Sequence, residues 1–91
     1  MKIRTMITIR GQVQGVSFRY YTRYTADRLG VQGWVKNLPD GSVQGCFEGE
    51  EEAVRSLIDW CRTGPPAARV DEVQVEDERY TGELVGFEVR H

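Results

Sequence analysis

The spacing of the hydrophobic residues changes several times along the chain, and the order of these changes limits the possible folds more than any other feature. Apolar and β-branched residues alternate with other residues from Ile3 to Arg10, which is typical of a strand with one buried face. Between Ser17 and Leu29 the apolar residues recur at helical spacing, and Gly30 provides a stop. The sequence therefore begins with a predicted strand that ends at Arg10, followed by a predicted helix.

A β-hairpin is predicted next. Val31–Leu38 has strand-like character, residues 39–41 have the turn sequence Pro-Asp-Gly, and Ser42–Glu48 alternates again. The two segments should pair as antiparallel strands.

The remaining residues predict a second helix and two further strands. Four residues at helical spacing form the buried stripe of this helix: Val54, Leu57, Ile58 and Cys61. Gly64–Pro66 ends it. A strand spans roughly Val70 to Glu78, and Phe87 and Val89 indicate a short last strand.

This order of elements predicts an α+β protein. Two helices on one face of a mostly antiparallel sheet of four to five strands form a ferredoxin-like (βαββαβ) sandwich, the simplest arrangement that buries two amphipathic helices and four half-apolar strands. With 91 residues there is room for one domain, and we expect residues 1–91 to form it. The same fold occurs in RNA-binding modules, metal carriers, regulatory domains and enzymes, so it does not define a function.

Composition argues against several classes of protein. No apolar run approaches the roughly 18 residues of a membrane span, and the N-terminus lacks the apolar region of a signal peptide, so we expect a cytoplasmic protein without a membrane partner. Cys46 and Cys61 have neither metal-ligand spacing nor a secreted context and are expected to be free thiols. The acidic run at residues 50–52 could hold a metal, but the helix dipole explains acids at a helix start better.

The segment Gly11–Arg19 joins the first predicted strand to the first predicted helix and reads Gly-Gln-Val-Gln-Gly-Val-Ser-Phe-Arg. Its two glycines allow the backbone to approach a ligand closely, and the first N–H groups of the helix have no partner inside it. Such a loop can bind an anion. Arg19 supports this interpretation, because the helix dipole disfavours a cation in the first turn unless something negative lies nearby.

The distribution of charge indicates the same segment. Residues 1–26 contain five Lys and Arg and no acidic residue, whereas all 14 Asp and Glu lie from Asp27 onward. In a chain with a net charge of −2, a segment without carboxylates avoids repelling an anionic ligand. Alternatively, the absence of acidic residues from so short a segment could be due to chance.

Three tyrosines on the first predicted helix suggest another kind of ligand. Tyr20, Tyr21 and Tyr24 could form, with Arg23, a stacking surface for nucleic acid. Tyrosines at a helix flank more often cover the edge of a core, and the acidic balance elsewhere disfavours a polyanion. We therefore expect no nucleic-acid partner.

The loop lacks the usual groups for proton transfer. No histidine, cysteine or carboxylate lies near it in the sequence, and His91, the sole histidine, is the last residue, where a frayed end is expected. No Gly-Lys-Ser or Gly-Lys-Thr follows the glycines, so a nucleotide-type phosphate loop is excluded. The loop amides and Arg19 can hold a phosphoryl group, and Asn37 can orient a neutral partner. Such a site can accelerate phosphoryl transfer when the leaving group is already good, as the carboxylate of an acyl phosphate is.

Two motifs resemble those of the acylphosphatase family. Gly11–Arg19 is similar to the family's signature, and Gly33–Asn37 followed by Asp40–Val43 is similar to its second motif. The resemblance covers nearly the whole chain. It implies an enzyme that hydrolyses acyl phosphates without a metal or cofactor, in which Arg19 is the phosphate-binding catalytic arginine and Asn37 positions the attacking water.

The resemblance also implies a substrate-binding role for the loop. Next to Arg19, the backbone of four residues would cradle the phosphoryl oxygens: Gly15, Val16, Ser17 and Phe18. The substrate would be a small-molecule acyl phosphate, and inorganic phosphate would be both the product and a competitive inhibitor. We expect a monomer.

A non-catalytic binding module is the rival hypothesis. It would use the same loop to hold a phosphorylated metabolite or an RNA backbone. Asn37 favours the enzyme, because a binding module needs no water-orienting amide opposite the arginine.

Overall fold

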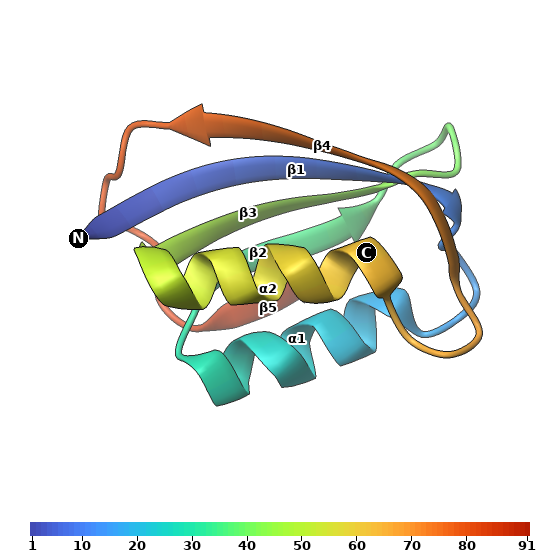
Figure 1. Cartoon of the computed structure of the whole chain (residues 1–91), viewed down its shortest axis with the longest axis horizontal. Coiled ribbons are helices and arrows are strands. Elements are labelled where there is room, and N and C mark those ends of the chain that lie inside the picture. The colour runs from blue at the N-terminus through green and yellow to red at the C-terminus, as the bar shows by residue number, and fades with distance from the viewer.

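The computed structural model describes residues 1–91 and has the predicted order of helices and strands (Figure 1). Its elements are β1 (Lys2–Gln12), α1 (Phe18–Leu29), β2 (Gln32–Asn37), β3 (Val43–Glu50), α2 (Glu51–Thr63), β4 (Arg69–Glu78) and β5 (Phe87–Arg90). The short fifth strand is present. Neither helix has the length and apolar character that a membrane crossing requires.

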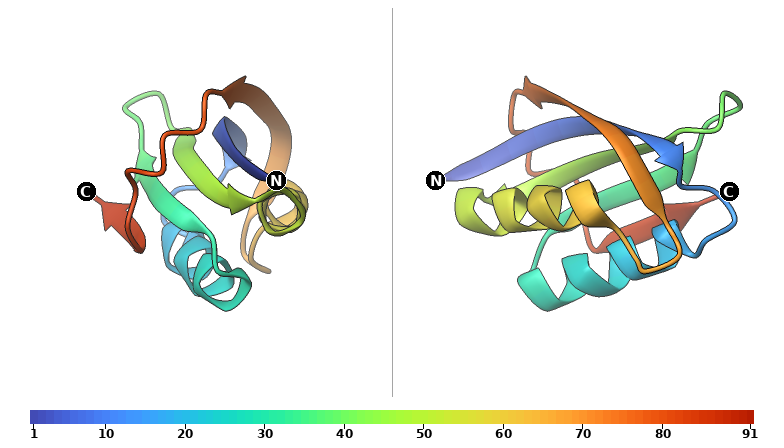
Figure 2. Two further views of the ribbon diagram at one scale, coloured as in Figure 1. Left: turned by 90° about the vertical axis from the view of Figure 1, so that its left-hand side faces the viewer. Right: turned by 45° about the vertical axis from the view of Figure 1, so that its right-hand side comes forward.

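The strands form one sheet in the order β4-β1-β3-β2-β5. Neighbouring strands are antiparallel except β2 and β5, which run parallel. Both helices pack on the same face of this sheet (Figures 1 and 2). The predicted ferredoxin-like α+β sandwich is therefore confirmed, with β5 as an edge strand beside β2.

The core lies between the helices and the sheet. Each helix buries one face, and the fully buried residues of the core include Ile7, Ile9, Phe18, Ala26, Val35, Val43, Phe47, Val54, Leu57 and Cys61. The predicted buried stripe of α2 and the predicted alternation in β1 are confirmed, and Val43 and Phe47 of β3 are buried as predicted. The opposite face of β3 is also covered, because Cys46 and Glu48 are buried as well. These contacts set the positions of the β1–α1 loop and the end of β2 relative to one another.

The end of β1 differs from the prediction. The register between β1 and β4 shifts after Arg10, and Gly11 and Gln12 continue to pair with β4. Gly11 has φ +136°, and a Cβ there would lie 2.1 Å from the carbonyl oxygen of Arg69. Gly11 thus permits the close approach of β4 rather than of a ligand. The prediction that it belongs to the anion-binding loop is wrong.

The two cysteines lie in different layers. Cys61 lies on the buried face of α2 and belongs to the core between the helices and the sheet. Cys46 alternates with Phe47 along β3, so its side chain points to the face of the sheet away from the helices. Both are free and buried, and burial raises the pKa of both thiols. The predicted register of β3 is confirmed.

A buried carboxylate holds the segment between β4 and β5. Glu48 accepts hydrogen bonds from the N–H and hydroxyl of Thr81 and from the N–H of Gly82, and it pairs with Arg4 at 3.3 Å. Burial alone would raise the pKa of Glu48, but these hydrogen bonds outweigh it and lower the pKa below its ordinary value. The contacts fix the path of the chain into β5, and β5 carries the last residues toward the β1–α1 loop (Figure 2).

Candidate active site

Residues 13–17 form the loop between β1 and α1. Two of them have a left-handed backbone: Gly15 with φ +75° and Ser17 with φ +62°. A Cβ at Gly15 would meet no atom within 4 Å, so its backbone conformation, and not crowding, calls for glycine. Ser17 is the only non-glycine residue of the chain with a positive φ. Strained backbone of this kind persists mainly at functional sites.

The first turn of α1 lacks the usual caps. Ser17 occupies the N-cap position, but its side chain makes no capping hydrogen bond, and the first turn contains no acidic residue. The N–H groups of Phe18, Arg19 and Tyr20 are therefore not satisfied by any side chain of the protein. Together with the helix dipole, these groups favour an anion at this end of α1.

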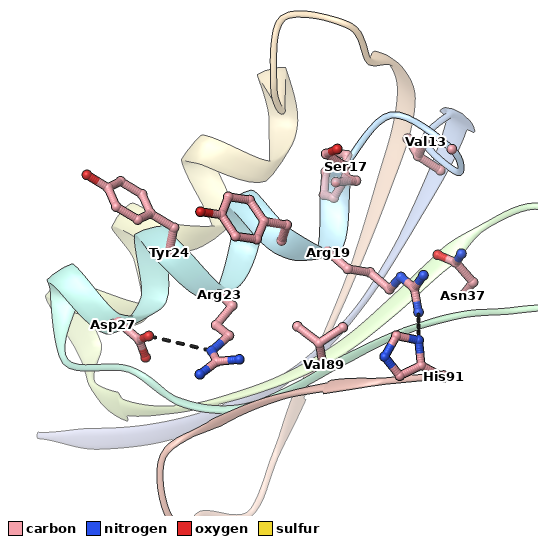
Figure 3. A pocket seen from close by; sticks show the side chains of 12 residues that line it. Val13, Ser17, Arg19, Arg23, Tyr24, Asp27, Asn37, Val89 and His91 are labelled. Carbon is pink, nitrogen blue, oxygen red and sulfur yellow. Dashed lines mark hydrogen bonds and ion pairs between the residues drawn. The ribbon is translucent and has the colours of Figure 1, made fainter.

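Arg19 extends from this turn toward β5 and the end of β2 (Figure 3). Its Nη1 donates a hydrogen bond to the carbonyl oxygen of Arg90 at 2.7 Å and lies 3.3 Å from Nδ1 of His91. None of the ion pairs of the chain involves Arg19. β5 thus positions the guanidinium without neutralising it, and its other N–H groups can donate charge-assisted hydrogen bonds to an oxyanion.

Asn37 is the last residue of β2, where it pairs with Val43 of β3. It lines the same cavity as Arg19, and its side chain lies beside the guanidinium (Figure 3). Oδ1 of Asn37 is buried and accepts no hydrogen bond. Because a buried amide oxygen without a partner costs free energy, its presence here requires an explanation. No donor of the protein satisfies this oxygen, and the side chain that carries it lines the cavity.

Gln14 connects the loop to the turn that follows Asn37, a role that the sequence analysis did not predict. Its Nε2 donates hydrogen bonds to the carbonyl oxygens of Leu38 at 2.8 Å and Ser42 at 2.9 Å. The loop and the end of β2 are therefore tied together by a side chain as well as by the core. The only sequence signal for Gln14 is its place within the Gly11–Arg19 motif.

Asp40 stiffens the same turn. Its Oδ1 accepts hydrogen bonds from the hydroxyl and the N–H of Ser42, and its Oδ2 pairs with Arg10 at 2.9 Å. The bond from the hydroxyl, then the other two contacts, lower the pKa of Asp40 to about 2. The turn therefore keeps these contacts throughout the neutral pH range.

The position of His91 differs from the prediction. A frayed terminal residue was predicted, but the ring of His91 contacts Arg19 and lines the cavity. Nothing in a terminal position signals such a role. The parallel pairing of β5 with β2, which connects residues far apart in the sequence, brings this residue to the site.

The cavity has a volume of about 690 Å³. Five of the predicted site residues line it: Gly15, Ser17, Phe18, Arg19 and Asn37. Val16 does not, because its side chain packs against the core, so it can serve the site only through its backbone. No group of three or more His, Cys, Asp or Glu side chains is placed to hold a metal ion.

The fold and the cavity define a class of protein: an α+β sandwich with an uncapped helix start, an unneutralised guanidinium and a buried amide oxygen. The Acylphosphatase family model matches residues 5–89. The chain is 62% identical to the acylphosphatase of Geobacter sulfurreducens and 60% identical to that of Geotalea uraniireducens, over 91 residues and 100% of both chains in each case. The crystal structure of acylphosphatase from Bacillus subtilis has a TM-score of 0.94 and 34% identity, covering 98% of this chain and 99% of that one. The chain therefore belongs to the acylphosphatase family.

Proposed function

We propose that the chain hydrolyses the carboxyl-phosphate bond of acyl phosphates to give a carboxylate and inorganic phosphate. The observation that carries the proposal is that Asn37, whose amide oxygen has no donor within the protein, lines the same cavity as Arg19. Simple phosphate binding gains nothing from such an oxygen, whereas hydrolysis needs a group that orients water. Membership of the acylphosphatase family supports the same activity.

In this proposal the loop and Arg19 hold the phosphoryl group. Its oxygens accept hydrogen bonds from the backbone N–H groups of residues 15–18 and from the guanidinium. These donors stabilise the charge on the phosphoryl oxygens in the transition state. The leaving carboxylate takes the electron pair of the breaking P–O bond and needs no proton, because it is a weak base.

Asn37 orients the attacking water. Its Oδ1 accepts a hydrogen bond from the water, whose oxygen then faces phosphorus from the side opposite the leaving group. A new P–O bond forms as the bond to the carboxylate breaks, and the proton of the water passes to a phosphoryl oxygen and leaves with inorganic phosphate. No side chain has to accept a proton, which agrees with a site made of an arginine, an amide and backbone N–H groups.

We also propose that residues 1–91 act as one domain, as a cytoplasmic monomer, without a metal, a cofactor or a nucleic-acid partner. Inorganic phosphate presents the same oxygens to the loop and should act as a competitive inhibitor. The edge strand β4 supports the monomer and the absence of nucleic acid, because its charges oppose pairing between copies and repel a polyanion. Its acidic residues are Asp71, Glu72, Glu76, Asp77 and Glu78.

Phosphate release from acetyl phosphate, with ethyl phosphate as the control, tests the proposal. Acetyl phosphate should be hydrolysed and ethyl phosphate should not, because an alkoxide is a much poorer leaving group than a carboxylate. Competition by inorganic phosphate is measured in the same assay. A protein that binds phosphate but releases none from acetyl phosphate would be the rival binding module.

A further inference from the structure

The cavity extends well beyond the phosphoryl-binding loop. Besides the loop and Asn37, its lining includes Tyr20 in the first turn of α1 and three residues one and two turns further along the helix: Arg23, Tyr24 and Asp27. Val89 of β5 lines it as well. A cavity of about 690 Å³ lies in the size range of sites that enclose whole small molecules. The acyl part of a substrate therefore has a defined direction, along α1 and away from the loop.

Arg23 lies in that direction. It is four residues after Arg19, so the two side chains lie on the same face of α1, about 6 Å apart along the helix axis. Figure 3 shows both side chains on the same side of α1, with Val89 between them. An acyl chain in the cavity would run from Arg19, past the apolar side chain of Val89, to Arg23.

The charge of Arg23 is only weakly satisfied within the protein. Its Nε lies 3.7 Å from Oδ2 of Asp27, and the two side chains are 57% and 58% exposed. An exposed ion pair at this distance contributes little to stability and is readily exchanged for another carboxylate. Arg19 and Arg23 also repel each other as like charges at i,i+4, and a ligand that is anionic at both ends would relieve this repulsion.

We infer that Arg23 binds a second carboxylate on the acyl group, so that the preferred substrates are acyl phosphates of short dicarboxylic acids. This inference rests on the proposed function and adds a specificity-determining residue to it. The phosphoryl group lies at the loop and Arg19, two or three methylene groups lie over Val89, and the distal carboxylate lies at Arg23 in place of Asp27. Monocarboxylic acyl phosphates fit the same cavity but leave Arg23 unused.

Two pairs of substrates of equal chain length test the inference. Succinyl phosphate is compared with butyryl phosphate, and glutaryl phosphate with pentanoyl phosphate, so that each pair differs by a carboxylate in place of a methyl group. We expect kcat/KM to favour the dicarboxylic member of at least one pair by about fivefold at low ionic strength, and the preference to shrink with added salt.

Variants locate the effect. In Arg23→Gln the ratio of the two kcat/KM values should fall to about one, and in Arg23→Glu below one, whereas Arg28→Gln should keep the ratio of the unmodified protein. Arg28 is on the same helix and carries the same charge but does not line the cavity. Using the ratio cancels any general loss of activity in a variant.

The outcomes separate this inference from the proposed function. Equal ratios in the unmodified protein and Arg23→Gln, with all four substrates hydrolysed, would overturn the role of Arg23 and leave acyl phosphate hydrolysis intact. An equal fall of the ratio in Arg28→Gln would show a general effect of charge and would also overturn it. Failure to hydrolyse any of the four substrates would overturn both proposals.

Discussion

The N-termini of the two helices both lack a side-chain capping hydrogen bond, but they differ in the backbone of the N-cap residue and in the charge of the first turn. α2 begins immediately after β3, and its first turn contains Glu51 and Glu52. The N–H of Glu51 donates a hydrogen bond to the carbonyl oxygen of Met1, and its carboxylate pairs with Arg55 one turn later. The positive end of this helix dipole is thus satisfied by the protein's own groups.

α1 begins in the opposite way. Its N-cap residue, Ser17, has a left-handed backbone, and its first turn contains Arg19 in place of an acid. A cation in the first turn is repelled by the positive end of the helix dipole, so this helix start is less stable than that of α2. The difference suits the proposed function, in which an external anion completes the start of α1 that the protein's own groups leave open.

Of the changes at the two helix starts, removal of the Arg19 charge should have the largest effect on turnover. Arg19→Ala should lower turnover on an acyl phosphate by a factor on the order of 10³ or more, because one arginine at a phosphoryl group commonly contributes that much. Phosphate inhibition should weaken as well, since Arg19 contacts ground and transition states alike. Asn37→Ala should lower turnover by a factor on the order of 100 and leave phosphate inhibition nearly unchanged.

Initial rates and phosphate inhibition constants check this division of roles. Arg28→Ala, on the same helix but outside the cavity, is the control for loss of charge. Circular dichroism should show that all three variants are folded. An equal loss of phosphate affinity in Arg19→Ala and Asn37→Ala would contradict the division.

Giving α1 the acid that α2 has should produce a smaller effect. Tyr20 is 63% exposed and lies in the first turn of α1, so Tyr20→Glu places a carboxylate near the loop without disturbing the core. The inhibition constant of phosphate should rise about fivefold through repulsion, while the free energy of unfolding should rise slightly through the dipole.

Tyr20→Gln is the matched control for Tyr20→Glu, because it removes the ring without adding charge. Phosphate inhibition measured in both variants isolates the charge. If Tyr20→Glu binds phosphate as tightly as Tyr20→Gln does, then the start of α1 is not where the anion binds.

The converse change at α2 should affect stability and not activity. Glu51→Gln removes an acid from the first turn of α2 together with its ion pair to Arg55, and should lower the free energy of unfolding by about 0.5 kcal/mol. Urea denaturation measures this change, with Glu83→Gln, which lies outside any helix, as the control. Turnover should stay at the level of the unmodified protein, and a fall in turnover would show that the two helix ends are coupled.

The smallest expected effect is that of pH on turnover. Guanidinium, amide and backbone N–H groups do not titrate between about pH 5 and 8, so kcat should change by less than about threefold there, apart from ionisation of the substrate. The ring of His91 contacts Arg19. The pH profile of turnover is therefore measured for the unmodified protein and for His91→Asn. A strong chelator should leave the turnover of both proteins unchanged.

A steep step in the pH profile that is absent from His91→Asn would assign a catalytic role to the histidine. A step present in both proteins would indicate a titrating group that the proposed mechanism lacks. Either result would contradict a mechanism in which no side chain accepts a proton.

Sequence patterns and motifs predicted most of this molecule. Alternation and helical spacing place five strands and two helices in the observed order, because both report on which face of an element is buried. Local rules about glycine and the helix dipole predicted a role for the β1–α1 loop and Arg19, and the structure places both at the cavity. Asn37 was identified because it lies in a motif at the end of a strand.

Three features lay beyond these patterns because contacts between distant segments decide them. Gly11 reads as a loop glycine, but the approach of Arg69 in β4 makes it a strand residue. Nothing in the sequence around Gln14 indicates a partner, but its side chain donates hydrogen bonds to two carbonyl oxygens of the turn after β2. His91 was expected to be a frayed terminal residue, but the pairing of β5 with β2 brings it into contact with Arg19.

The sequence by itself determined the elements, their order and the chemical character of the loop, since each depends on residues that are neighbours along the chain. Only the tertiary structure decided which groups meet across the cavity. The pairing of β5 beside β2 places the Arg90 carbonyl oxygen under the Arg19 guanidinium, and the sheet register places the Asn37 amide next to it. Such distances depend on strand order and crossovers, which hydrophobic spacing does not encode.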